Sequence, residues 1–131
     1  MNDIKPQIKI AAAVILNDAN QILLVRKAGT DVFMQPGGKI EPNEDALSAL
    51  RREVEEELGI SNIEATYIGP YSAPAANEPD HEVVAEIFKA HINCQPHAAA
   101  EIAETIWFDP TSAEDIKIAP LSEILIGQFK S

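Results

Sequence analysis

The stretch from 37 to 60 constrains the fold most, because a pair of glycines leads into an acidic segment with helical periodicity. Its apolar residues recur three or four positions apart, as they do on one face of a helix: Leu47, Leu50, Val54 and Leu58. Asn43 is a candidate N-cap, and Gly59 is a candidate stop in the left-handed conformation. The stretch therefore predicts a helix over 43–58 whose apolar face packs against a second layer.

This predicted helix carries an unusual concentration of acid. Between positions 41 and 57, seven acidic residues stand against two arginines and supply five of the eleven excess negative charges. Glu53, Glu56 and Glu57 share one face, about a third of a turn from the apolar stripe. Like charges at these spacings repel, and the carboxyl end of a helix also disfavours anions. We therefore expect a cation beside these three glutamates.

The residue types indicate which cation this is. Three carboxylates without sulfur or imidazole suit a hard ion, and magnesium is the candidate because it keeps waters and bridges to phosphates. The alternative is an ordinary solvated acidic face with ion pairs such as Arg52 to Glu56. The upstream glycines favour the metal site, since they and the small Ala46 and Ala49 allow a loop or a phosphate to approach the helix.

The remaining segments predict a sheet around this helix. Strands are expected over 8–16, 21–26, 63–71, 82–92 and 105–108. The first two are separated by Asn-Asp-Ala-Asn, which favours a hairpin, whereas 33–38 (FMQPGG) predicts a shaped loop and 72–80 a long surface loop. A terminal helix is expected with Pro120 in its first turn. This order indicates an α/β layer sandwich with a mixed β-sheet, in a single domain over 1–131.

The composition excludes several classes of protein. With 46% hydrophobic and 24% charged residues, the chain is globular rather than disordered or fibrous. Its net charge of −11 repels nucleic acid and anionic membranes, so we expect neither as a partner. The longest apolar run, 10–16, is too short to span a bilayer and lacks the flanks of a signal peptide. With Cys94 as the single cysteine, these features favour a reducing, cytoplasmic location.

The acidic stretch resembles the Nudix box, the signature of the Nudix hydrolases, written G-x5-E-x7-R-E-U-x-E-E-x-G-U with U apolar. All nine constrained positions are filled, by Gly38, Glu44, Arg52, Glu53, Val54, Glu56, Glu57, Gly59 and Ile60. The resemblance continues, with lower specificity, into the preceding hairpin, the segment 33–38 and the segment 101–107. It therefore covers most of the chain.

This resemblance implies both a fold and a reaction. The fold is a Nudix-type α/β/α sandwich with a mixed β-sheet, whose box presents glutamates to Mg²⁺ or Mn²⁺. The reaction is hydrolysis of a nucleoside diphosphate linked to another moiety, by attack of water on phosphorus. Glu53, Glu56 and Glu57 match the family's metal-binding glutamates, and Arg52 matches the arginine that orients a catalytic glutamate, here Glu53. Gly38 matches the loop glycine beside these residues and is the expected substrate-binding glycine.

Other candidate residues lie outside the helix. Arg26, Lys27 and Lys39 are the cations that we expect near the substrate phosphates, with an ordinary surface position as the alternative, most readily for Lys27. A further catalytic carboxylate is expected from Glu101, six residues before Trp107. The competing carboxylates are Glu104, just before the predicted strand 105–108, and Glu86, within the predicted strand 82–92.

The resemblance also narrows the substrate. The chain is similar to the MutT-like branch, whose members cleave nucleoside triphosphates to monophosphate and pyrophosphate, so this is the expected reaction. That branch reads an oxidised purine with an asparagine near the C-terminus, and the alignment places Ser122 there as a substrate-binding residue. ADP-ribose and other sugar nucleotides are the alternative substrates. A non-catalytic nucleotide sensor is the alternative of a different class, and the base and the oligomeric state stay open.

Overall fold

A ten-residue strand, β1 (Gln7–Leu16), runs through the middle of the computed structural model, which describes residues 6–76, 78–112 and 115–129. Residues 11–15 of this strand are at most 1% exposed, because both faces of the strand are covered. Strand β6 (Glu82–His91) pairs with β1 in parallel along its whole length. Strand β2 (Ile22–Lys27) and strand β4 (Gly37–Lys39) pair antiparallel with the other edge of β1.

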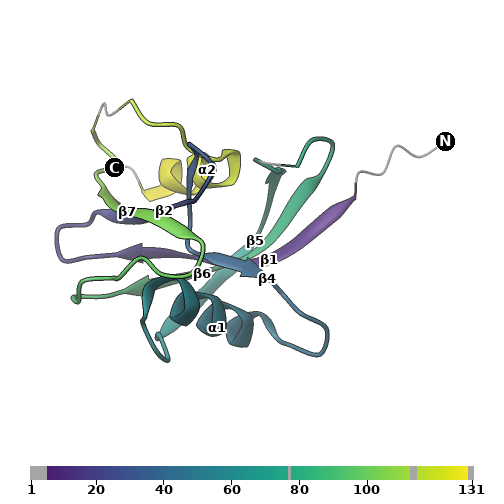
Figure 1. Cartoon of the computed structure of the whole chain (residues 1–131), viewed down its shortest axis with the longest axis horizontal. Coiled ribbons are helices and arrows are strands. Elements are labelled where there is room, and N and C mark those ends of the chain that lie inside the picture. The colour runs from purple at the N-terminus through teal and green to yellow at the C-terminus, as the bar shows by residue number, and fades with distance from the viewer. Residues whose placement is uncertain (1–5, 77, 113–114, 130–131) are drawn as a thin grey trace.

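In the described residues, seven strands form one mixed sheet with one helix on each face (Figure 1). The remaining elements are β3 (Phe33–Met34), β5 (Ala65–Pro74), β7 (Ile102–Phe108), α1 (Ala46–Leu58) and α2 (Pro120–Phe129). Strand β5 extends the sheet beyond β6, and β3 and β7 both pair with β2. This arrangement confirms the predicted α/β/α sandwich with a mixed sheet.

The alternation of side chains along β1 builds two cores. Ala13 and Ile15 pack with the apolar stripe of α1, including Leu50. Val14, on the opposite face, packs with Leu125 of α2. A continuous apolar run such as 10–16 is therefore required, since a strand covered on both faces has no solvent-facing side. In the described part of the chain, neither helix has the length and apolarity to cross a membrane.

The segment predicted as a shaped loop, 33–38, is instead partly strand, so this prediction was wrong. Gly37 and Gly38 lie opposite Ala12 and Ala11 in an antiparallel ladder. A Cβ on Gly37, whose φ is 148°, would collide with the backbone of β1 at Ala11. The glycine allows β4 to pair this closely with the central strand.

The predicted helix is present, but it begins later than expected. Its N-cap is Asp45, whose side chain accepts a hydrogen bond of 2.7 Å from the Ser48 N–H, and not Asn43. Asn43 lies in the preceding turn with a positive φ of 66°. Asparagine and aspartate both serve as N-caps and both tolerate turns. The sequence alone therefore does not show which of the two residues caps the helix. Gly59 ends the helix in the left-handed conformation with φ 71°, as predicted.

The other elements match the predictions with shifted ends. Strands β1 and β2 form the expected hairpin, and α2 starts at Pro120. Strand β5 continues to Pro74, which lies opposite Glu82, so the predicted long loop over 72–80 is shorter. Strand β7 begins at Ile102 rather than at 105, because it pairs with β2 as far as Lys27.

Candidate active site

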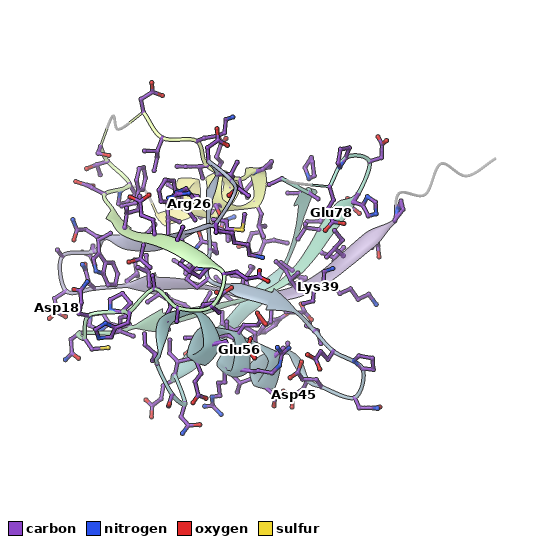
Figure 2. The ribbon with its side chains drawn as sticks, viewed as in Figure 1. Asp18, Arg26, Lys39, Asp45, Glu56 and Glu78 are labelled. Carbon is purple, nitrogen blue, oxygen red and sulfur yellow. The ribbon has the colours of Figure 1, made fainter. Side chains whose placement is uncertain are left out.

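Strand β4 lies against α1, and Figure 2 shows Lys39 of the strand above Glu56 of the helix. The Gly37 N–H donates a hydrogen bond of 3.2 Å to Oε1 of Glu57. A Cβ at Gly38 would collide with the side chain of Glu53, so that carboxylate occupies the space which glycine leaves open. Two consecutive glycines therefore bring the strand backbone against two glutamates one helical turn apart.

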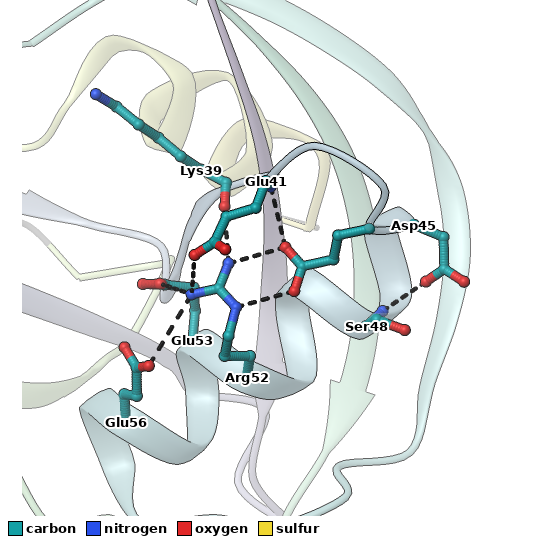
Figure 3. Close-up of polar contacts among 8 residues, drawn as sticks. Lys39, Glu41, Asp45, Ser48, Arg52, Glu53 and Glu56 are labelled. Atoms are coloured by element: carbon teal, nitrogen blue, oxygen red, sulfur yellow. Dashed lines mark hydrogen bonds and ion pairs between the residues drawn. The ribbon is translucent and has the colours of Figure 1, made fainter.

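The Arg52 guanidinium ties the middle of α1 to the turn before the helix (Figure 3). Its Nε and Nη2 donate to the two carboxylate oxygens of Glu44, each at 2.9 Å. Its Nη1 donates to Oε2 of Glu53 at 2.9 Å, and its Nη2 donates to the Lys39 carbonyl at 3.1 Å. Figure 3 shows the Lys39 ammonium pointing away from this cluster, so its positive charge does not pair with these carboxylates.

Arg52 also concentrates negative charge around itself. Oxygens of Glu41 and Glu56 lie 3.5 Å and 4.0 Å from Nη1. The hydrogen bonds from Arg52 lower the pKa of Glu44 to about 2, so that carboxylate stays ionised at neutral pH. The arginine offsets part of the repulsion among the glutamates of the helix, as expected for a cation among like charges.

Glu57 has a different environment, because it is only 6% exposed. Burial raises its pKa to about 7, against the opposing effects of the Gly37 N–H and the positive charge of Lys27. The negative charges of Glu53 and Glu56 raise the pKa further. At neutral pH this carboxyl group is therefore partly protonated, and a cation beside it would favour the ionised form.

The donor chemistry of this helix suits a divalent hard cation, since only carboxylates and backbone groups are present. Yet within 6–76, 78–112 and 115–129, no three His, Cys, Asp or Glu side chains are arranged to hold a metal ion. Glu57 is bonded to Gly37, Glu53 is bonded to Arg52, and Glu56 is exposed. The structure thus places the three predicted ligands on one stretch of helix without assembling them into a ligand set.

A cavity of about 180 Å³ opens beside the glycine pair. Lysine side chains from β2 and β4, Lys27 and Lys39, lie at its border together with Gly37 and Gly38. Its walls are mainly apolar and come from β1, β6, the β5–β6 connection and the start of α2: Ile8, Ile10, Ala12, Val83, Pro74, Ala75, Ala119 and Leu121. The cavity is therefore mainly apolar, and its charged lining residues are the two lysines and Glu78, next to the helix glutamates.

A family model described as the NUDIX domain matches residues 6–127, which is nearly the whole chain. The chain belongs to the NUDIX family. The CTP pyrophosphohydrolase of Escherichia coli (strain K12) is 30% identical over 125 residues, covering 93% of the Nudix chain and 90% of that protein. The 8-oxo-dGTP diphosphatase of Haemophilus influenzae is 40% identical over 65 residues, covering 47% of this chain and 48% of that protein. The latter match therefore spans about half of that relative.

Solved structures of Nudix proteins share this fold. The MutT Nudix hydrolase from Burkholderia pseudomallei superposes with a TM-score of 0.79 at 25% identity, covering 95% of this chain and 98% of that one. The MutT protein from Methanosarcina mazei Go1 gives a TM-score of 0.78 at 23% identity, covering 95% and 94%. These likenesses extend over all the layers described above, so the sandwich is the Nudix fold.

The structure brings three of the expected substrate-binding residues of this Nudix protein to one cavity: Gly38, Lys39 and Ser122. Arg26 does not line this cavity, and its role near the phosphates stays a prediction. Its Nε pairs with Glu104 at 3.1 Å, and its Nη1 donates to the Thr30 carbonyl at 2.9 Å. The adjacent Lys27 lines the cavity instead, because successive residues of a strand point to opposite faces.

The three candidate carboxylates outside the helix lie in different places. Glu104 is the partner of Arg26, and Glu86 accepts a hydrogen bond of 2.9 Å from the Tyr67 hydroxyl. Glu101 is exposed, in a turn that is tied to the helix: the Ala99 N–H donates to the Glu57 carbonyl at 3.0 Å. Of these carboxylates, Glu101 is therefore on the segment nearest to the buried glutamate of the box.

One lining residue has no counterpart in the sequence-based prediction. Gln35 is 6% exposed and lines the cavity beside Ser122. It stands directly before Pro-Gly-Gly, in a segment that the sequence identifies only as a turn. Its burial depends on α2, more than 80 residues away, so no local pattern marks it as a site residue.

Proposed function

We propose that this Nudix protein hydrolyses a nucleoside triphosphate to a nucleoside monophosphate and pyrophosphate with Mg²⁺ or Mn²⁺. The observation that carries the proposal is the position of the cavity. An apolar space suited to a nucleobase and sugar opens next to Gly37 and Gly38, whose other side touches the helix carboxylates. A triphosphate extending from this space would therefore reach the acidic helix.

The residues of the chain have separate tasks in this proposal. Lys27 and Lys39 supply positive charge to the phosphates at the border of the cavity. Glu53, Glu56 and Glu57 would hold the divalent ion, which when bound neutralises phosphate charge so that water can reach phosphorus. Arg52 is a positioning residue, because its hydrogen bond to Oε2 of Glu53 restricts the orientation of that carboxylate.

The attacking water also needs a group that orients it and accepts its proton. We assign this role to the Glu101 carboxylate, since its turn is bonded to the backbone of α1 beside Glu57. Glu104 is less suited, because its carboxylate is already bound to the Arg26 guanidinium. The proton would pass from the water to a carboxylate oxygen of Glu101 as the oxygen attacks phosphorus.

The names of the relatives support a nucleotide as the substrate. The relative that aligns over most of its length is a CTP pyrophosphohydrolase, and a second relative is an 8-oxo-dGTP diphosphatase. Ser122, where an asparagine is expected for oxidised purines, has a shorter side chain and lacks the paired donor and acceptor of an amide. An unmodified nucleoside triphosphate is therefore the substrate class that we favour.

The test is turnover of a panel of nucleoside triphosphates and ADP-ribose, with products identified by mass spectrometry. We expect equal amounts of monophosphate and pyrophosphate from at least one triphosphate, with magnesium and not with EDTA. Glu53→Gln and Glu57→Gln should each lose about two or more orders of magnitude in kcat. The matched control is Glu55→Gln, on the exposed side of the same helix, where the carboxylate bonds Ser61.

Three results would contradict the proposal. Cleavage of ADP-ribose alone would move the protein to the sugar-nucleotide class. Tight nucleotide binding without turnover would make it a sensor. Full activity of folded Glu53→Gln would remove the box from the chemistry.

A further inference from the structure

Gln35 is a polar side chain placed deep beside the cavity. It joins β3 to β4 and is 6% exposed. Its backbone N–H donates a hydrogen bond of 3.0 Å to the Ser122 hydroxyl of α2. Both residues line the cavity among apolar neighbours.

The orientation of the Gln35 amide is determined by its own contacts. Nε2 donates a hydrogen bond of 2.9 Å to the Ala13 carbonyl of β1. Since a carbonyl accepts only, the nitrogen must face Ala13, and Oε1 must face another direction. Among the buried side-chain atoms of the described ranges, Gln35 Oε1 alone has no hydrogen-bond partner. Buried polar atoms are nearly always paired, so this acceptor calls for a donor that the chain does not supply.

The chemistry of the missing donor follows from the surroundings. An amide oxygen accepts hydrogen bonds and repels phosphate oxygens, so it is not a phosphate ligand. The positive charges suited to phosphates, Lys27 and Lys39, are also at the border of the cavity. Apolar walls with a few convergent polar groups are typical of sites that bind flat, largely apolar rings. A nucleobase has such a ring and carries N–H groups on its edge.

We propose that Gln35 Oε1 accepts a hydrogen bond from an N–H group on the nucleobase of the substrate and so determines base specificity. This inference rests on the proposed function, since it takes the ligand to be a nucleotide. Ser122 completes the contact: its oxygen accepts from the Gln35 N–H, which leaves its own proton available to an acceptor beside the base N–H. The N–H belongs either to an exocyclic amino group, as in cytosine, adenine and guanine, or to a ring N–H, as in uracil and guanine.

The first experiment uses the wild-type protein and titration calorimetry with nucleoside monophosphates, which have no phosphoanhydride bond to hydrolyse. CMP and AMP are compared with their analogues lacking the exocyclic amino group, pyrimidin-2-one riboside and purine riboside monophosphates. UMP and GMP are compared with their N3-methyl and N1-methyl derivatives, and GMP is also compared with IMP, which lacks the exocyclic amino group. We expect loss of the base N–H to weaken binding by about tenfold or more in at least one pair, because the amide oxygen is again left unpaired. The pair affected distinguishes the amino from the ring N–H source.

The second experiment repeats the affected pair with Gln35→Met, which keeps the length of the side chain and removes its hydrogen bonds. The tenfold difference should fall to about twofold or less, while affinity for ribose 5-phosphate, which has no base, is retained. Gln21→Met is the matched control, because Gln21 bonds Asn17 in the β1–β2 turn and is not a lining residue. It should leave the difference unchanged.

Several outcomes would overturn the assignment. Wild-type affinities within about twofold in every pair, or no tighter than that of ribose 5-phosphate, would show that the base N–H is not read. Full discrimination in folded Gln35→Met would transfer the contact to another group. Should the variant not fold, the analogue pairs on the wild-type protein still decide. Failure of hydrolysis with base-selective binding retained would count against the proposed function alone.

Discussion

Gly37 and Gly38 are adjacent, yet a side chain added at each position would meet a different part of the molecule. At Gly37 the added carbon would collide with the backbone of β1, which cannot move away without breaking the ladder. At Gly38 it would meet the side chain of Glu53, which can rotate. A substitution at Gly37 should therefore mainly lower stability, whereas a substitution at Gly38 should mainly lower activity.

We predict that Gly37→Ala lowers the free energy of unfolding by about 3 kcal/mol, through backbone collision and a positive φ. Gly38→Ala should change it by about 1 kcal/mol or less but lower kcat by about tenfold or more, because the Glu53 carboxylate is displaced. Urea unfolding and steady-state turnover measure the two effects. The control is Gly127→Ala, where nothing lies within 4 Å of the added carbon and φ is not positive. Full activity of Gly38→Ala would contradict the packing of Glu53 against this glycine.

The buried carboxyl group of Glu57 makes the stability of the fold depend on pH. Its pKa is about 7 in the folded protein and near 4.5 in the unfolded chain, so the folded state binds more protons between these values. The contribution of the neutral group to stability is fully present below pH 4.5 and is lost as pH rises through 7. The loss is about 3 kcal/mol by linkage in the absence of divalent metal.

Chemical unfolding of wild type and Glu57→Gln between pH 4 and 8, with EDTA, measures this effect. The wild-type free energy of unfolding should fall relative to that of the variant as pH rises, since the glutamine stays neutral. Magnesium should reduce the difference, because a bound cation stabilises the ionised carboxylate. A difference that is independent of pH would contradict the raised pKa.

At the scale of elements, the register between β2 and β7 separates two glutamates that look alike in the sequence. Arg26 lies opposite Glu104 in the ladder, and the two side chains form an ion pair. Glu101 precedes the strand, and its carbonyl accepts a hydrogen bond of 2.8 Å from the Ala28 N–H. The strand pairing therefore places Glu104 in an ion pair with Arg26. It places the turn that contains Glu101 beside the end of α1.

We predict that Glu101→Gln lowers kcat by about tenfold or more with little change in KM, because a glutamine cannot accept the proton of the attacking water. Glu104→Gln should leave kcat close to that of wild type and lower stability by less than about 1 kcal/mol, as expected for an exposed ion pair. Steady-state kinetics on both variants tests the pair. A large loss at Glu104 with none at Glu101 would exchange their roles.

At the scale of the whole molecule, the charge decides which ligands can approach. The net charge is −11, whereas the cavity has two lysines at its border. A long polyanion would meet repulsion over most of the surface, but a free nucleotide is small enough to enter the cavity, where Lys27 and Lys39 outnumber the acidic lining residue Glu78.

We therefore predict no appreciable affinity for duplex DNA at physiological salt. Fluorescence anisotropy of a labelled duplex should stay unchanged up to protein concentrations of about 10 μM, because few phosphate contacts can form. A labelled nucleoside triphosphate with magnesium, titrated in parallel, is the positive control. Salt-sensitive binding of the duplex at low micromolar protein would contradict the prediction.

Features that depend on near neighbours in the chain can be predicted from local sequence patterns. The apolar spacing of α1, its end at Gly59 and the β1–β2 hairpin follow from periodicity and turn chemistry within short segments. The same holds for the Nudix box, whose spacing places its glutamates on one length of helix before any packing is known. The layered sandwich also follows, since a two-sided apolar strand and an amphipathic helix have few ways to bury their surfaces.

Features that depend on contacts between distant segments could not be predicted in this way. The raised pKa of Glu57 comes from burial beneath β4, and the choice of Lys27 over Arg26 comes from strand pairing and side-chain direction. The unpaired oxygen of Gln35 exists because β1 and α2 take up its other hydrogen-bonding groups. Burial and hydrogen-bond satisfaction are properties of contacts between segments far apart in the chain, so no local pattern encodes them.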